Sequence, residues 1–226
     1  MKHTKEHYLP KGKLVPIFCA NESQDVKALT LSLSKHTAAR GEKVCVIDCL
    51  SGTLMADAGI IFQKTLANVL CDGADLKDAI YVTSNEHFTM MAAGEIEPEH
   101  ILGSLAAFSL DYDWLYVAMP SGCTPVHVRL AGAADETLLC YVNEADQFMR
   151  AYWMVDAIRK RHPKFDPCLV STGPHTDSEN IANTLRETVR GFLGGPPTYI
   201  GHETDAHLNQ SLIAHMDSDN ASIQVA

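Results

Sequence analysis

The sequence predicts an α/β protein with a doubly wound, mostly parallel sheet and helices on both faces. Leu14–Asp48 has the pattern of strand, loop, helix and second strand that builds parallel sheets. Further along, short apolar runs alternate with helical patterns, the order typical of parallel strands joined by right-handed crossovers. With 226 residues, 46% of them hydrophobic, the chain is long enough to bury its core as one domain.

The first unit shows each element clearly. Leu14–Ala20 is an apolar run that predicts a strand, and Val26–Arg40 carries apolar residues at helical spacing. Ser23 is a candidate N-cap for this helix, and Gly41 follows its end as a C′ residue. Val44–Asp48 is a continuous apolar run closed by an acid, as expected of a strand buried on both faces.

The rest of the chain continues the alternation. We expect strands at Phe88–Ala92, Trp114–Ala118, Glu136–Val142, Cys168–Ser171 and Tyr199–Gly201. We expect helices at Leu66–Leu70, Leu76–Ile80, Pro98–Phe108, Pro125–Ala133, Glu144–Arg161, Asp177–Leu193 and Ala206–His215. No linker or repeat divides the sequence, so residues 1–226 are predicted to form a single domain, with loose tails at 1–12 and 216–226.

Composition excludes several classes of function. No stretch approaches the roughly 18 apolar residues of a membrane span, and Met1–Lys13 lacks the apolar segment of a signal peptide, so a cytoplasmic protein is expected. The net charge of −10 disfavours nucleic acid and anionic membranes, because binding to both depends on excess Lys and Arg. Protein partners are expected instead.

The loop after the first strand lacks the chemistry of a phosphate-binding loop. Such a loop needs glycines for converging backbone N–H groups, a lysine for charge and a Ser or Thr for Mg²⁺. Ala20–Ala28 contains no glycine, and Glu22 and Asp25 would repel a polyphosphate. No cofactor is therefore expected, and ATP with Mg²⁺ is the alternative.

Seven cysteines and eleven histidines raise the question of a metal or redox site. Most cysteines lie in apolar runs and are interpreted as reduced core thiols. The alternative is that Cys19, Cys49 and Cys123, each near a strand end, meet at one edge of the sheet. No CxxC or H-E-x-x-H pattern is present, His207 and His215 are interpreted as surface residues, and no metal site is predicted.

Ordered phrases along the chain resemble the MinD/ParA family of P-loop ATPases, most of all its flagellar branch, FlhG or FleN. They run in the family's order over about residues 14–213. The phrases are ARGEKVCVID at 39–48, TLANVL at 65–70, DLKDAI at 75–80, MMAAG at 90–94, YDWLYV at 112–117, PSG at 120–122 and AADETLL at 133–139.

The resemblance also shows where the ATP motifs differ. Asn21 stands where the family's first motif has its early lysine, and Lys27 matches the later lysine only with an extra loop residue, followed by Ala28 in place of Thr. Asp48 matches the strand-end Asp of the second motif, but Leu50 occupies the position of the water-positioning Asp.

Two further requirements of the family's chemistry are missing. Ala118 replaces the Asp that holds Mg²⁺ through water, and Ser171–Thr172 lies where the family has the Asn that reads adenine. Because four requirements fail together, we expect hydrolysis to be lost and no catalytic residue to remain. Lys27 and Asp48 would be a vestigial nucleotide site.

The resemblance implies a non-catalytic, FlhG-like pseudo-ATPase that acts as a regulatory or scaffold protein in placement, number or assembly of a bacterial surface organelle such as the flagellum. Its partners would be proteins: a second copy of the chain or an active ATPase paralogue. Partners would recruit it to a cell pole or organelle base. One alternative is a pilus or secretion-machine localisation factor of the TadZ/CpaE kind. Another is an ATPase whose atypical site uses Lys27, Asp48 and Ser121.

Overall fold

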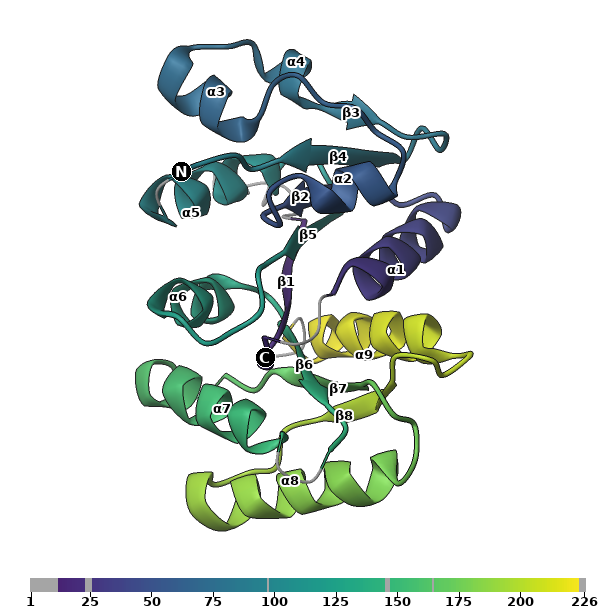
Figure 1. Ribbon diagram of the computed structural model, residues 1–226, viewed down its shortest axis with the longest axis vertical. Coiled ribbons are helices and arrows are strands. Elements are labelled where there is room, and N and C mark those ends of the chain that lie inside the picture. The colour runs from purple at the N-terminus through teal and green to yellow at the C-terminus, as the bar shows by residue number, and fades with distance from the viewer. Residues whose placement is uncertain (1–11, 23–25, 97, 145–146, 164, 224–226) are drawn as a thin grey trace, which may run out of the picture.

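An eight-stranded sheet organises the molecule (Figure 1). The computed structural model describes residues 12–22, 26–96, 98–144, 147–163 and 165–223. The strand order is β3-β4-β2-β5-β1-β6-β7-β8, with β3 antiparallel to β4 and the other pairs parallel. The strands are β1 Lys13–Cys19, β2 Val44–Asp48, β3 Tyr81–Val82, β4 Phe88–Ala92, β5 Trp114–Ala118, β6 Leu138–Val142, β7 Cys168–Thr172 and β8 Tyr199–His202. The predicted fold class is confirmed.

Helices cover both faces of this sheet (Figure 1). They are α1 Lys27–Ala39, α2 Thr53–Asp57, α3 Leu66–Asp72, α4 Leu76–Ala79, α5 Pro98–Phe108, α6 Pro125–Ala133, α7 Met149–Arg161, α8 Ser178–Leu193 and α9 Leu208–Ile223. Helices α1, α2 and α9 pack on one face, and α5, α6, α7 and α8 contribute to the apolar core on the other. The sheet is therefore doubly wound.

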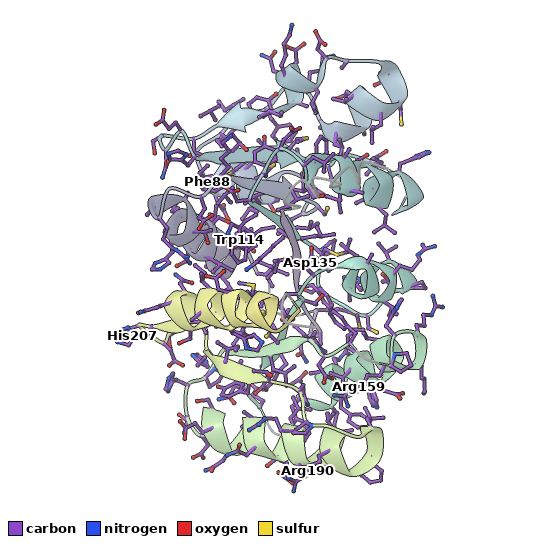
Figure 2. The ribbon with its side chains drawn as sticks, turned by 180° about the vertical axis from the view of Figure 1, so that it is seen from behind. Phe88, Trp114, Asp135, Arg159, Arg190 and His207 are labelled. Atoms are coloured by element: carbon purple, nitrogen blue, oxygen red, sulfur yellow. The ribbon has the colours of Figure 1, made fainter. Side chains whose placement is uncertain are left out.

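Two apolar layers, one on each face, hold the sheet to its helices. Phe88 and Trp114 belong to the layer beneath α1 and α9, and Figure 2 shows both among the strands. Arg190 and His207 lie at the outside of the molecule in the same view. Strands β1, β2, β5, β6 and β7 are buried almost throughout, which explains their continuous apolar sequences.

Strand β1 occupies the turning point of the topology. It pairs with β5 on one side and β6 on the other, and the helices that follow β1 and β5 lie on opposite faces. In open α/β sheets ligands bind outside the carboxyl ends of the strands at such a point. A ligand-binding site in this fold is therefore expected at the loops after β1, β2 and β5.

Several element boundaries differ from the sequence expectations. Helix α1 begins at Lys27 with Val26 as its N-cap residue, and the proposed cap Ser23 lies outside the described residues. Helix α7 begins at Met149 rather than Glu144. Two short elements, α2 and β3, have no counterpart in the expectations, because neither is long enough to show a period.

The expectation of a loose tail from Met216 onward is wrong for the part that the structure describes. Helix α9 continues to Ile223, and the Met216 side chain is buried against the sheet with Leu212 and Ile213. Lys13 donates from Nζ to the Met216 carbonyl at 2.8 Å and pairs with Asp217 at 2.7 Å. Because this stretch is acidic and has few large apolar residues, its sequence did not indicate a helix.

Among the described residues, no helix is both long and apolar enough to cross a bilayer.

Candidate functional site

The loops after β1 and β5 lie next to each other at the carboxyl edge of the sheet. The backbone N–H of Met119 donates to the Ile17 carbonyl at 2.9 Å, and that of Gly122 donates to the Cys19 carbonyl at 2.8 Å. These bonds extend the β1–β5 pairing past the strand ends. Segments 21–27 and 119–125, which follow these two strands, thus start from neighbouring strand ends.

Asn21 is the anchor of the first loop. Its side chain is 1% exposed, and its Oδ1 accepts a hydrogen bond from the Val142 N–H at 3.0 Å. Its Nδ2 donates to Gln147 at both the side-chain Oε1, 2.8 Å away, and the carbonyl, 3.2 Å away. The amide therefore joins the end of β1 to the end of β6 and to the segment before α7.

Asp48 holds the turn that follows β2. The carboxylate is fully buried at the end of β2, where Oδ1 accepts from the Leu50 N–H at 2.7 Å and Oδ2 from the Met55 N–H at 2.9 Å. Met55 lies in α2, so both oxygens hold the turn that leads into this short helix. Of the two roles that a strand-end Asp has, capping of the next turn is the one seen here.

Lys27 contacts the same short helix from the other side. Its Nζ lies 3.0 Å from an oxygen of Asp57, the last residue of α2. Lys27 and Asp48 thus both make contacts with α2. Glu22 forms an ion pair with Arg150 of α7, with Oε1 and Nη1 3.7 Å apart. Asp25 lies outside the described residues. A role of Lys27 and Asp48 toward a nucleotide stays a prediction.

His127 shapes the turn after β5. Its Nε2 donates to the Pro120 carbonyl at 2.7 Å, so Nδ1 accepts from Thr124, whose Oγ1 lies 2.7 Å and whose backbone N 3.3 Å away. The imidazole packs edge-on against Phe18 with ring centroids 4.8 Å apart. Burial lowers the pKa of His127 below its ordinary value, which keeps the ring neutral. Ser121 lies in this turn, partly exposed.

The three cysteines Cys19, Cys49 and Cys123 do not form a metal or redox cluster. Their sulfur atoms are not among the groups of potential metal ligands that lie within 4.8 Å of one another in the described part of the chain. The group that meets this distance is Glu136, Cys168 and His215, at the opposite edge of the sheet. Cys19 is buried beside Cys140 of β6, and burial raises the pKa of its thiol to about 11, so it carries no thiolate at neutral pH. Cys123 is exposed. The hypothesis of a site built on these three residues is wrong.

A polar cavity of about 660 Å³ lies further along the carboxyl edge, between the start of α8 and the edge strand β8. His175 and Asp205 line it and contact each other, with Nε2 and Oδ1 3.0 Å apart. His202 lies behind this pair, fully buried, and donates from Nε2 to the Gly173 carbonyl at 3.0 Å. The cavity is separated from β1 by β6 and β7, so it is distinct from the loops described above.

Solved structures of known proteins share this architecture, whereas sequence comparisons find no match. No protein-family model matches the sequence, and neither does any curated protein. Solved structures match with high probability. The MinC:MinD cell division protein complex from Aquifex aeolicus is 16% identical, with 92% of this chain and 89% of that chain covered and a TM-score of 0.67.

Two other relatives in structure have different roles in their names. A complex of a McdA variant with ATP from Cyanothece is 16% identical over 89% of this chain and 88% of that chain, with a TM-score of 0.66. A plasmid partition protein from Borrelia burgdorferi is 14% identical over 93% of this chain and 100% of that one, with a TM-score of 0.62. The chain has the fold of the MinD/ParA ATPases. At these identities, the comparison establishes the MinD/ParA fold and leaves the activity to be argued from the residues.

The contacts of Asp48 predict how its substitution affects stability. Asp48→Asn replaces one acceptor oxygen by a donor that faces a backbone N–H, and we expect a loss of about 1–3 kcal/mol in the free energy of unfolding. Lys27→Ala removes a partly exposed ion pair with Asp57 and should cost less than about 1 kcal/mol. Urea denaturation of both variants measures this difference. Equal losses in the two variants would contradict the capping role of Asp48.

The neutral state of His127 predicts a dependence of stability on pH. Below about pH 6.5 an unfolded histidine takes up a proton that the folded one resists, so the folded state loses stability as the pH falls. His127→Gln keeps a donor and an acceptor but does not titrate. We expect its unfolding free energy to fall less steeply than that of the wild type between about pH 7 and 5, by up to about 1.4 kcal/mol per pH unit. Parallel pH profiles would refute this role of His127.

Proposed function

We propose that this chain is a non-catalytic, FlhG-like relative of the MinD/ParA ATPases. It would act as a regulatory or scaffold protein in the placement, number or assembly of a bacterial surface organelle such as the flagellum. The MinD/ParA fold supports the relationship. The organelle comes from the resemblance of the ordered sequence phrases to the flagellar branch.

The observation that carries the loss of catalysis is the state of Asn21. A phosphate-binding loop presents charge and backbone N–H groups to a ligand, whereas this side chain is buried and makes its hydrogen bonds to β6 and Gln147. A lysine in its place would put an ammonium group against the Val142 N–H, a donor facing a donor. The position is adapted to joining the end of β1 to the end of β6.

The other motif positions support the same conclusion. Asp48 is fully buried and accepts backbone N–H groups with both oxygens, so its carboxylate is engaged in the turn into α2. Ala118, at the end of β5, has no group that binds a metal ion. Lys27 pairs with Asp57. The groups at this edge do not fit a magnesium nucleotide.

Partners are the natural ligands of such a scaffold. Because the loops 21–27 and 119–125 lack nucleotide chemistry, they remain available as a contact edge for a second copy or for an active ATPase paralogue. The Aquifex aeolicus relative is known in a complex of MinC with MinD, which supports a protein partner for this fold. Recruitment to a cell pole or organelle base would follow from that partner, in the cytoplasm and without direct membrane or nucleic-acid binding.

Calorimetric titration of Mg-ATP and Mg-ADP into the purified protein tests the loss of the nucleotide site. We expect no heat of binding and no shift in melting temperature at millimolar nucleotide. Micromolar binding that Lys27→Ala abolishes would overturn the proposal and favour the alternative, an ATPase with an atypical site at Lys27 and Asp48.

A deletion of the gene in its source organism tests the process. We expect a changed number or position of flagella, counted by electron microscopy. A plasmid copy carrying Lys27→Ala should restore the wild-type count as well as the unmodified gene does, because the function does not depend on nucleotide. Normal flagella with defective pili or secretion would favour a localisation factor of the TadZ/CpaE kind and contradict the flagellar assignment.

A further inference from the structure

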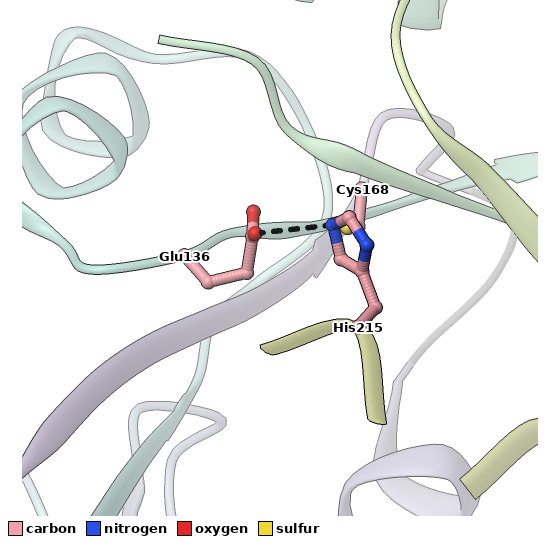
Figure 3. A group of neighbouring side chains, drawn as sticks. All are labelled: Glu136, Cys168 and His215. Atoms are coloured by element: carbon pink, nitrogen blue, oxygen red, sulfur yellow. Dashed lines mark ion pairs between the residues drawn. The ribbon is translucent and has the colours of Figure 1, made fainter. Parts of the chain in front are cut away.

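Three potential metal ligands meet at the amino edge of the sheet, opposite the loops described above (Figure 3). Glu136 lies just before β6, Cys168 is the first residue of β7, and His215 lies on α9. The ligand atoms of the three side chains all lie within 4.8 Å of one another. Residues 32 or more positions apart in sequence, from the segment before β6, the start of β7 and helix α9, thus converge on one point.

We propose that Glu136, Cys168 and His215 bind a divalent cation of the zinc class, with water as the fourth ligand. A thiolate, an imidazole and a carboxylate are the three donor types that zinc uses in proteins. Hard cations such as Mg²⁺ and Ca²⁺ are disfavoured because a sulfur donor suits softer metals. The proposal is independent of the function proposed above.

The distances suit such an ion. Tetrahedral zinc with bonds of about 2.0–2.3 Å places neighbouring ligand atoms about 3.3–3.6 Å apart. His215 Nε2 and Glu136 Oε2 are 3.7 Å apart, and one ligand atom from each of the three residues lies within 4.8 Å of the other two. The ligand atoms are therefore close to the spacing of a zinc site, and slightly wider than it.

Hydrogen bonds to the backbone position two of the three residues. Glu136 accepts from the Thr137 N–H through Oε1 at 2.8 Å, so Oε2 is the oxygen that faces His215. The Cys168 N–H donates to the Thr137 carbonyl at 2.8 Å, which places the cysteine beside the glutamate through the pairing of β6 with β7. Outer contacts of this kind orient the first ligands of metal sites.

Helix α9 brings the third ligand from a fixed position. Met216, next to His215, is buried, and its carbonyl accepts from Lys13 Nζ at 2.8 Å. The Cys168 side chain is buried, whereas His215 is 25% exposed, so an ion would enter from the side of the helix. A bound ion would join the C-terminal helix to the two strands β6 and β7. It would therefore stabilise the fold.

Cobalt titration tests the site with a probe that reports the ligand type. The full-length protein is stripped with a chelator, dialysed and titrated with Co²⁺, which gives a thiolate-to-metal absorption band when sulfur coordinates it. We expect a band that saturates at one Co²⁺ per chain and is displaced by Zn²⁺. Cys168→Ser should abolish the band, and His215→Gln should weaken binding tenfold or more. Cys71→Ser, which alters an exposed cysteine on α3, should leave both unchanged.

Thermal unfolding supplies a second readout that separates binding from misfolding. We expect Zn²⁺ at a hundredfold excess over its Kd to raise the melting temperature of the stripped wild type by about 5 °C or more. His215→Gln keeps a side chain of similar size and should fold, yet lose most of this shift. The proposal is overturned if no band forms at stoichiometric Co²⁺, or if the band or the shift persists undiminished in His215→Gln.

Discussion

The buried amide of Asn21 connects the centre of the sheet to its carboxyl edge. Its oxygen satisfies the N–H of Val142 at the end of β6, and its nitrogen donates to Gln147. A buried backbone N–H without a partner is costly, so this position needs a neutral acceptor. This one side chain therefore joins the end of β1 to the end of β6 and to the segment before α7.

The same use of polar side chains recurs along the edge. Asp48 holds the turn into α2, and His127 holds the turn after β5 by bridging Pro120 and Thr124. Each loop thus gains rigidity from a buried group that hydrogen-bonds to backbone. The side chains of Asn21, Asp48 and His127 at this edge thus form hydrogen bonds within the protein. This is the physical basis for proposing a scaffold rather than an ATPase.

The amino edge is held by the same kind of contact. There, carboxylates accept from the N–H groups at the starts of strands and loops, as Asp135 does from Leu14 at 2.8 Å and Asp113 from Lys43 at 2.8 Å. Helix α9 returns to this edge and brings His215 to the carboxylate of Glu136. The two edges of one sheet therefore separate the loops of the proposed contact surface from the proposed metal site.

The sequence by itself determined the fold class and most of the elements. Buried parallel strands such as Trp114–Ala118 appear in the sequence as continuous apolar runs, and amphipathic helices appear as apolar residues at helical spacing. Both patterns arise because burial restricts composition over many residues. The positions compared with the family's nucleotide motifs are local as well, and the loss of nucleotide binding stays a prediction. Only the tertiary structure decided what Asn21 and Asp48 contact, that α9 continues past Met216, and that Glu136, Cys168 and His215 meet. These facts depend on contacts between distant segments, and no local pattern in a single sequence encodes them.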